Sequence, residues 1–144
     1  MLGLAIATHM RPLGPTAVLS PALGGVVIGH EVGRALGVRA VFAERVDGAL
    51  TLRRGFTLGA GDRVLVVEDV VTTGGSTAET IAAARVAGAT VVGAASIIDR
   101  SDGSVDLGVR YQALASIALP TYSADACPLC RDGRAIEKPG SRSI

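Results

Sequence analysis

The chain has 144 residues, of which 49% are hydrophobic and 19% are charged, and its formal net charge is +1 at pH 7. This length suits one domain over residues 1–144, and the apolar fraction is too high for a disordered chain. A net charge near zero argues against binding nucleic acid by neutralising many phosphates, and no apolar run reaches the ~18 residues that span a bilayer. The first ten residues lack the charged start of a secretory signal. We therefore expect a cytoplasmic protein with neither nucleic acid nor membrane as a partner.

The first half of the chain predicts two helices and two strands. A short apolar helix is expected over residues 2–10, which Pro12 would end. A buried strand over 16–20, a helix over 26–36 and a second strand over 38–43 follow. Residues 46–56 are polar and contain an Asp-Gly turn signal, so a mobile hairpin or loop is expected there.

The second half of the chain continues this alternation. The apolar run 64–67 predicts a buried strand over 63–68, and an alanine-rich helix is expected over 76–87. Two further strands are expected over 89–98 and 114–119, and residues 123–144 form a polar tail. Continuous apolar strands that alternate with helices predict an α/β fold, in which helices cover both faces of a parallel sheet.

Two adjacent carboxylates, Glu68 and Asp69, follow the strongest predicted strand. Ligands of open α/β sheets bind beyond the carboxyl ends of the strands. Acids buried there need partners, such as a sugar with its hydroxyls and an associated cation. The alternative is an ordinary solvated strand end. We favour a binding site, because a glycine-rich loop comes directly after the pair.

The loop Thr72-Thr73-Gly74-Gly75-Ser76 combines hydroxyl groups with two glycines that let the backbone approach an anion. Ser76 and Glu79 have the spacing of a capping box, which predicts a helix N-terminus. Free amides at such an end favour a phosphate at residues 72–77. A tight strand-to-helix turn is the alternative. The loop lacks the lysine of a P-loop, and no Gly-x-Gly-x-x-Gly opens the first helix, so these two nucleotide-binding motifs are excluded.

Residues 64–76 together resemble the phosphoribosyl-pyrophosphate motif of the type I phosphoribosyltransferases. The resemblance implies that Glu68 and Asp69 contact the ribose hydroxyls of 5-phosphoribosyl 1-diphosphate (PRPP), and that the following loop wraps its 5′-phosphate. Residues 20–25 look like the pyrophosphate loop of that family. Arg100 looks like the arginine that meets the orotate carboxylate in orotate phosphoribosyltransferases. The tail over 127–142 is similar to that of one bacterial group of those enzymes.

The resemblance therefore implies a Rossmann-like phosphoribosyltransferase fold and transfer of the phosphoribosyl group of PRPP to orotate. The products would be orotidine 5′-monophosphate and diphosphate, and Mg²⁺ would be bound mainly through the diphosphate, with no protein ligands of its own. The enzyme would be a homodimer whose flexible loop closes over the neighbouring active site. The implied catalytic residues are Glu68, Asp69 and Arg45. The implied substrate-binding residues are Ala22, Leu23, Gly24, Glu68, Asp69, Val70, Val71, Thr72, Thr73, Gly74, Gly75, Ser76 and Arg100.

The chain departs from that family in two features. The stretch 42–54, which corresponds to the flexible loop, contains no lysine or histidine, and the single lysine of the chain is Lys138. Only residues 1–11 precede the first core connection, so we expect most of the N-terminal hood that encloses the base to be missing. Two alternatives therefore stay open: a purine phosphoribosyltransferase of the same fold and a non-catalytic PRPP-binding regulator. For Arg100 the alternative is a surface ion pair with Asp99 or Asp102.

Cys127 and Cys130 form a single Cys-x-x-Cys near the end of the chain. The pair has three interpretations: an exposed turn with two reduced thiols, a metal clip shared across a dimer, or a redox pair. The exposed turn is favoured, because a structural zinc site needs four ligands and His9 and His30 lie far upstream.

Overall fold

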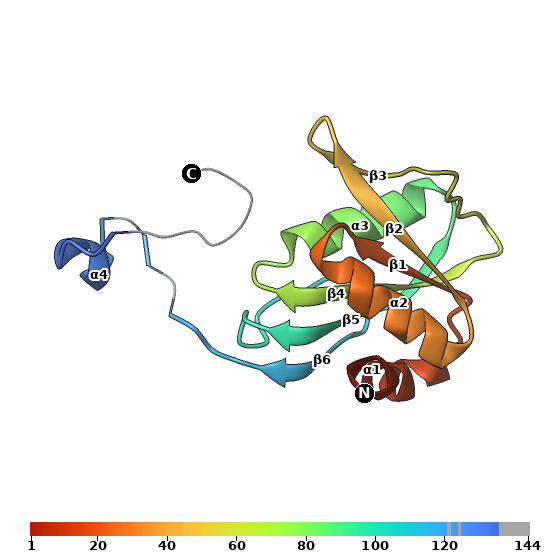
Figure 1. Cartoon of the computed structure of the whole chain (residues 1–144), viewed down its shortest axis with the longest axis horizontal. Coiled ribbons are helices and arrows are strands. Elements are labelled where there is room, and N and C mark those ends of the chain that lie inside the picture. The colour runs from red at the N-terminus through yellow and green to blue at the C-terminus, as the bar shows by residue number, and fades with distance from the viewer. Residues whose placement is uncertain (121, 124, 136–144) are drawn as a thin grey trace.

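A six-stranded sheet forms the centre of the computed structural model, which describes residues 1–120, 122–123 and 125–135. Its strands lie in the order β3-β2-β1-β4-β5-β6 (Figure 1). Neighbouring strands are parallel except for β2 and β3, which form an antiparallel hairpin. The strands are β1 (Ala17–Pro21), β2 (Arg39–Val46), β3 (Ala49–Leu52), β4 (Arg63–Val71), β5 (Thr90–Asp99) and β6 (Tyr111–Ser116).

Helices cover both faces of this sheet. Helices α1 (Leu2–Met10) and α2 (Gly24–Leu36) pack on one face, and α3 (Gly75–Val86) packs on the other (Figure 1). A 3₁₀ turn, η1 (Arg11–Leu13), follows α1, and the short helix α4 (Pro128–Arg131) lies in the C-terminal segment beyond β6. In the part of the chain that the structure describes, no helix is long and apolar enough to cross a membrane.

The central strand β4 shows why the run 64–67 is apolar without interruption. Val64 and Val66 belong to the core beneath α3, whereas Leu65 and Val67 belong to the core beneath α2. All four side chains are fully buried. Because successive side chains of a strand point to opposite faces, a strand covered by helices on both sides needs an apolar residue at each position.

The predicted α/β fold is confirmed, with corrections at three strands. β4 continues past Glu68 to Val71, because it pairs with β5 as far as Asp99. β2 continues to Val46 because it forms the hairpin with β3, which also makes the predicted parallel sheet a mixed one. The last strand begins and ends three residues earlier than predicted, because it pairs with β5 from Tyr111 onward. The tail segment that contains Lys138 lies outside the described residues.

Candidate active site

The loops that follow β1 and β4 meet at one edge of the sheet. β1 leads through α2 to β2 on one side, whereas β4 leads through α3 to β5 on the other side. Because two neighbouring parallel strands continue in opposite directions, their loops diverge and leave a crevice beyond the carboxyl ends of the strands. The two loops that the sequence singled out, 20–25 and 68–76, therefore flank one crevice.

Glu68 is buried in the last part of β4, with 9% of its surface exposed. The hydroxyl of Thr77, a fully buried residue of α3, donates a hydrogen bond to Oε2 of Glu68. Burial raises the pKa of Glu68 and the charge of Asp69 raises it further, whereas the hydrogen bond from Thr77 lowers it; the net pKa lies above the usual value. The carboxylate is thus held in place but poorly solvated, and a ribose hydroxyl would be a favourable partner for it.

Asp69 lies against the start of α2. A Cβ atom added to Gly24 would lie 2.5 Å from Oδ2 of Asp69, so glycine at this position leaves room for the carboxylate. The loop before α2 contains a cis peptide bond between Ala22 and Leu23, and the Leu23 side chain is exposed. The sequence predicts the acid pair and the 20–25 loop as separate features, and the structure brings them into contact.

Residues 72–77 line a small polar cavity of about 110 Å³ together with Glu68. Gly74 has a φ of 79°, a left-handed conformation that glycine adopts without steric cost. No side chain caps α3, so its first backbone N–H groups and the positive end of the helix dipole suit a phosphate. The predicted capping box is wrong, because Gly74 is the N-cap and the Glu79 carboxylate pairs with Arg45.

Arg100 follows β5 and borders the same loop. Its backbone N–H donates a hydrogen bond of 2.8 Å to the carbonyl oxygen of Val71. Arg100 also lines an open groove of about 670 Å³ with Thr72 and Thr73. The side chain is exposed, and it makes no ion pair with Asp99, Asp102 or another of the described residues. Its guanidinium is therefore accessible from the groove.

Asp99 shapes the turn that carries Arg100. Its carboxylate accepts hydrogen bonds from the backbone N–H groups of Ser101 (2.7 Å) and Gly103 (3.3 Å). Burial opposes the charged form of Asp99, but the hydrogen bonds from Ser101 and Gly103 outweigh burial, and the pKa of Asp99 is lowered. These two hydrogen bonds to Asp99 fix the backbone on the C-terminal side of Arg100.

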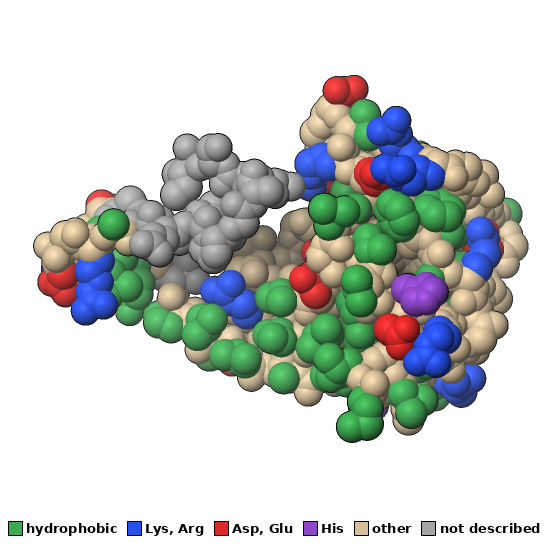
Figure 2. Space-filling model, viewed as in Figure 1, with side chains coloured by type: hydrophobic (Ala, Val, Ile, Leu, Met, Phe, Trp, Pro, Cys, Tyr) green, Lys and Arg blue, Asp and Glu red, His purple; other side chains and the backbone are tan. Residues whose placement is uncertain are grey.

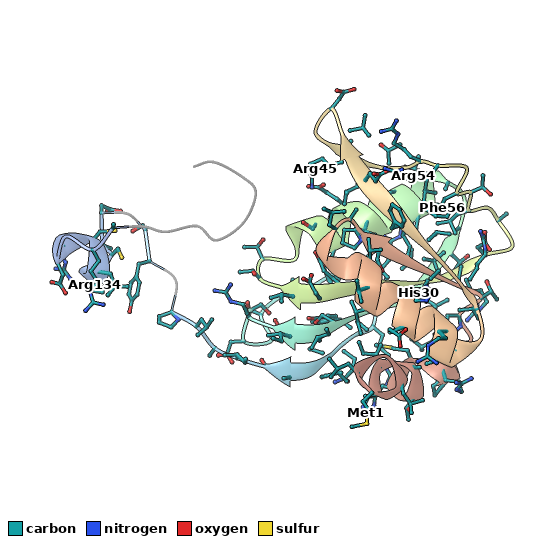
Figure 3. The ribbon with its side chains drawn as sticks, in the orientation of Figure 1. Met1, His30, Arg45, Arg54, Phe56 and Arg134 are labelled. Atoms are coloured by element: carbon teal, nitrogen blue, oxygen red, sulfur yellow. The ribbon has the colours of Figure 1, made fainter. Side chains whose placement is uncertain are left out.

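The β2–β3 hairpin lies against α3, and Arg45 extends from the hairpin to pair with Glu79 of that helix (Figure 3). The Arg45 guanidinium contacts the Glu79 carboxylate at 2.6 Å and donates a hydrogen bond to the carbonyl oxygen of Gly48. Arg54 forms two hydrogen bonds of 2.8 Å with Glu44. The implied catalytic residue Arg45 is thus paired within its own chain and does not line the polar cavity of residues 72–77.

Sequence reasoning missed the roles of two residues, Thr77 and Asp99. The hydrogen bond between Thr77 and Glu68 joins residues nine positions apart across the loop, a separation that no periodic pattern marks. Asp99 was visible only as a neighbour of Arg100. Among the implied residues, Val71 is fully buried, so it can offer a ligand its backbone but not its side chain.

The open α/β sheet thus carries an acid pair, a loop with free amides and a close glycine contact beyond the carboxyl ends of β1 and β4, where sheets of this kind bind their ligands. Residues 3–108 match the phosphoribosyl transferase domain family. Orotate phosphoribosyltransferases from Chlorobaculum parvum and Pelotomaculum thermopropionicum are 51% and 53% identical to this chain. Each match covers 96% of this chain, and 72% and 73% of those two proteins.

A solved structure gives the same result. The orotate phosphoribosyltransferase of Mycobacterium tuberculosis in complex with PRPP has a TM-score of 0.68 and 26% sequence identity to this chain. The match covers 80% of this chain and 70% of that one. The chain therefore belongs to the phosphoribosyltransferase family, and its similar relatives are orotate phosphoribosyltransferases.

Proposed function

We propose that this protein transfers the phosphoribosyl group of PRPP to orotate, which gives orotidine 5′-monophosphate and diphosphate. The observation that carries the proposal is that Glu68 lines the polar cavity of residues 72–77 while its neighbour Asp69 lies against Gly24 of the loop before α2. Relatives that share 51% and 53% sequence identity with this chain are named orotate phosphoribosyltransferases, which supports orotate as the base.

The acid pair would stabilise the ribose during transfer. Displacement at the anomeric carbon builds positive charge on the ribose ring and negative charge on the leaving diphosphate. Glu68 and Asp69 would place two carboxylates beside that ring, and the hydrogen bond from Thr77 holds the Glu68 carboxylate in position. Groups that are already oriented toward developing charge stabilise a transition state without reorganising.

Mg²⁺ fits this site as a companion of the diphosphate. Among the described residues, no three His, Cys, Asp or Glu side chains gather in a group that could cage a metal. The Asp69 carboxylate beside the 22–24 loop places a negative charge near a cation that would take its ligands from substrate oxygens and water. Bound there, Mg²⁺ would neutralise charge on the leaving diphosphate.

In a homodimer, the neighbouring subunit would supply a positively charged side chain, Arg45, to the diphosphate site. Leu23 and Val27 are 84% and 73% exposed beside a pocket of about 390 Å³ that Phe42 and Phe56 line. Figure 2 shows hydrophobic side chains gathered over the face that α1 and α2 form. Such a patch suits a self-complementary contact with a second copy. Arg45, on the hairpin next to this face, would then reach the diphosphate of the neighbouring subunit.

Arg100 and Thr72 would hold the base. A guanidinium fork pairs with a planar carboxylate through two parallel hydrogen bonds, and orotate carries such a carboxylate. The groove that both residues line is open to receive it. We also place the protein in the cytoplasm, because a reducing compartment suits its two free thiols.

Product formation with a panel of bases tests the proposal. The full chain, PRPP and Mg²⁺ are incubated with orotate, and separately with adenine, guanine, hypoxanthine and xanthine, and nucleotide and diphosphate are both measured. We expect orotidine 5′-monophosphate and diphosphate in equal amounts with orotate and no nucleotide with a purine. Turnover of a purine alone identifies a purine phosphoribosyltransferase. Binding of PRPP by calorimetry without turnover of any base identifies a PRPP-binding regulator.

A further inference from the structure

Cys127 and Cys130 lie on one closed turn of the C-terminal segment. Cys127 directly precedes α4 and Cys130 is its third residue. The backbone N–H of Arg131 donates to the carbonyl oxygen of Cys127, and that of Gly133 donates to the carbonyl oxygen of Cys130, so the turn is hydrogen-bonded around both residues. Residues three positions apart on such a turn have Cα atoms less than about 7 Å apart, a separation that a disulfide bond can bridge.

Both thiols are free and accessible. Neither cysteine is fully buried or fully exposed, and no disulfide is formed. Figure 3 shows Arg134, which follows α4, well away from the sheet, so this turn is not covered by the core of the domain. A small reagent can therefore reach the sulfurs.

The two thiols differ in their readiness to ionise. The backbone N–H of Cys130 and the Cys130 thiol lower the pKa of Cys127, although slight burial opposes them. Hydrogen bonding to Cys127 raises the pKa of the Cys130 thiol. The thiolate is the nucleophile in disulfide exchange, so Cys127 is the one prepared to attack.

We propose that Cys127 and Cys130 form a reversible dithiol–disulfide pair that is oxidised by small organic disulfides, with Cys127 as the attacking and Cys130 as the resolving residue. In the first step the Cys127 thiolate attacks one sulfur of the disulfide, which releases one thiolate and leaves a mixed disulfide on Cys127. In the second step Cys130 loses its proton and attacks Sγ of Cys127, which releases the second thiolate. Two protein thiols are oxidised, and one organic disulfide is reduced to two thiols.

A metal clip would need further ligands. Within the described ranges, no third His, Cys, Asp or Glu joins the two cysteines in a group that could hold a metal ion. The disulfide needs only the two residues that the turn brings together. The proposal does not rest on the transferase activity, and its test uses no substrate of that reaction.

The test exposes the reduced full-length protein to glutathione disulfide and follows its intact mass. We expect the wild type to lose the mass of two hydrogens, to lose both iodoacetamide-reactive thiols, and to regain them with dithiothreitol. Cys130→Ser should stop at one bound glutathione, and it should form that adduct at least about tenfold faster than Cys127→Ser does. Circular dichroism of both variants checks that they are folded.

Three results would overturn the proposal. One is a wild type that carries glutathione on both cysteines without closing the ring. Another is equal rates for the two serine variants, which would remove the assignment of the attacking residue. The third is stoichiometric zinc in the purified protein that protects both thiols until a chelator removes it, which would identify the metal clip instead.

Discussion

Gly24 is the residue at which the 20–25 loop and the acid pair touch. Gly24→Ala places a methyl group 2.5 Å from Oδ2 of Asp69, which is too close, so the carboxylate or the loop must shift. Gly24 is the first residue of α2 and the substitution changes only its contact with Asp69, so the melting temperature should change little. We expect kcat/KM for PRPP to fall at least about tenfold, a loss of about 1.4 kcal/mol of transition-state stabilisation.

Gly59→Ala is the matched control for this substitution. A Cβ atom there meets nothing within 4 Å, and Gly59 lies in the loop before β4, away from the crevice. Steady-state kinetics of the two variants should therefore differ. Equal activity of Gly24→Ala and Gly59→Ala would show that the position of Asp69 does not matter for transfer.

The buried Glu68 predicts a pH dependence of stability. Burial holds the pKa of Glu68 above its usual value of 4.5, so the folded chain binds this proton more tightly than the unfolded chain does. The free energy of unfolding therefore loses a contribution as the pH rises from about the usual carboxyl value through the raised pKa. Glu68→Gln removes this loss, and we expect the variant to gain stability relative to the wild type between pH 4 and pH 8.

Urea denaturation at both pH values measures this change, and Glu31→Gln provides a control of opposite sign. The hydrogen bond from Arg34 lowers the pKa of the exposed Glu31, so this variant should lose stability relative to the wild type over the same interval. If Glu68→Gln also lost stability relative to the wild type from pH 4 to pH 8, as Glu31→Gln should, burial would not be what controls the pKa of Glu68.

At the residue scale, the sequence identifies side chains whose type is unusual for their position. Glu68 and Asp69 stand out because two acids follow four apolar residues of a buried strand. The hydrogen bond between Thr77 and Glu68 could not be predicted, because it depends on how the loop folds the start of α3 back over β4. The contact of Gly24 with Asp69 likewise joins two loops that are distant in sequence.

The β2–β3 hairpin is the element that must change partners for Arg45 to reach a diphosphate. Its ion pair with Glu79 is half-exposed, with 37% and 47% of the two side chains accessible. An exposed pair of this kind contributes about 0.2–1 kcal/mol. Glu79→Gln frees Arg45, so we expect the KM for PRPP to fall by up to about fivefold with little change in kcat.

Asp62→Asn is the control, because it breaks the pair of Asp62 with Arg39 at the other end of β2. This variant should leave the KM for PRPP unchanged in the same assay. A KM that rises in Glu79→Gln would mean that the ion pair with α3 supports the active arrangement and does not compete with it.

The sequence predicts the centres of helices and strands, where burial alone decides the residue pattern. It does not predict where these elements begin and end. The apolar run 64–67 marks the centre of β4, but hydrogen bonds to β5 carry the strand on through Glu68 to Val71. The left-handed Gly74 sets the start of α3, whereas the Ser-x-x-Glu spacing wrongly indicated a start at Ser76. Partner strands and turn conformations, which one sequence does not display, decide these limits.

At the scale of the whole molecule, the order of the strands explains why one crevice holds the site. The alternation of strands and helices predicts a parallel sheet but not which strands are neighbours. The observed order places β1 beside β4 and so brings their loops together at the switch point.

The exposed apolar face predicts that the molecule is a dimer in solution. Val27 is 73% exposed on α2, and Val27→Glu would put a charge into the proposed contact. We expect sedimentation velocity to show a dimer for the wild type and a monomer for Val27→Glu, with transfer lost in the monomer because Arg45 of the partner is absent. Val86→Glu, at a position 90% exposed on α3 and on the opposite face, should remain a dimer. A fully active wild-type monomer would contradict the shared site.

The central claim is that the acid pair of β4 stabilises the ribose during transfer from PRPP, and Asp69→Asn tests it most directly. The measurement is the initial rate of orotidine 5′-monophosphate formation at saturating PRPP and orotate, compared with that of Asp106→Asn, an exposed aspartate in the loop after β5. We expect Asp69→Asn to lower kcat by about 10²-fold or more, with an unchanged melting temperature, and Asp106→Asn to keep the wild-type rate. An Asp69→Asn variant that turns over at the rate of Asp106→Asn would contradict the claim.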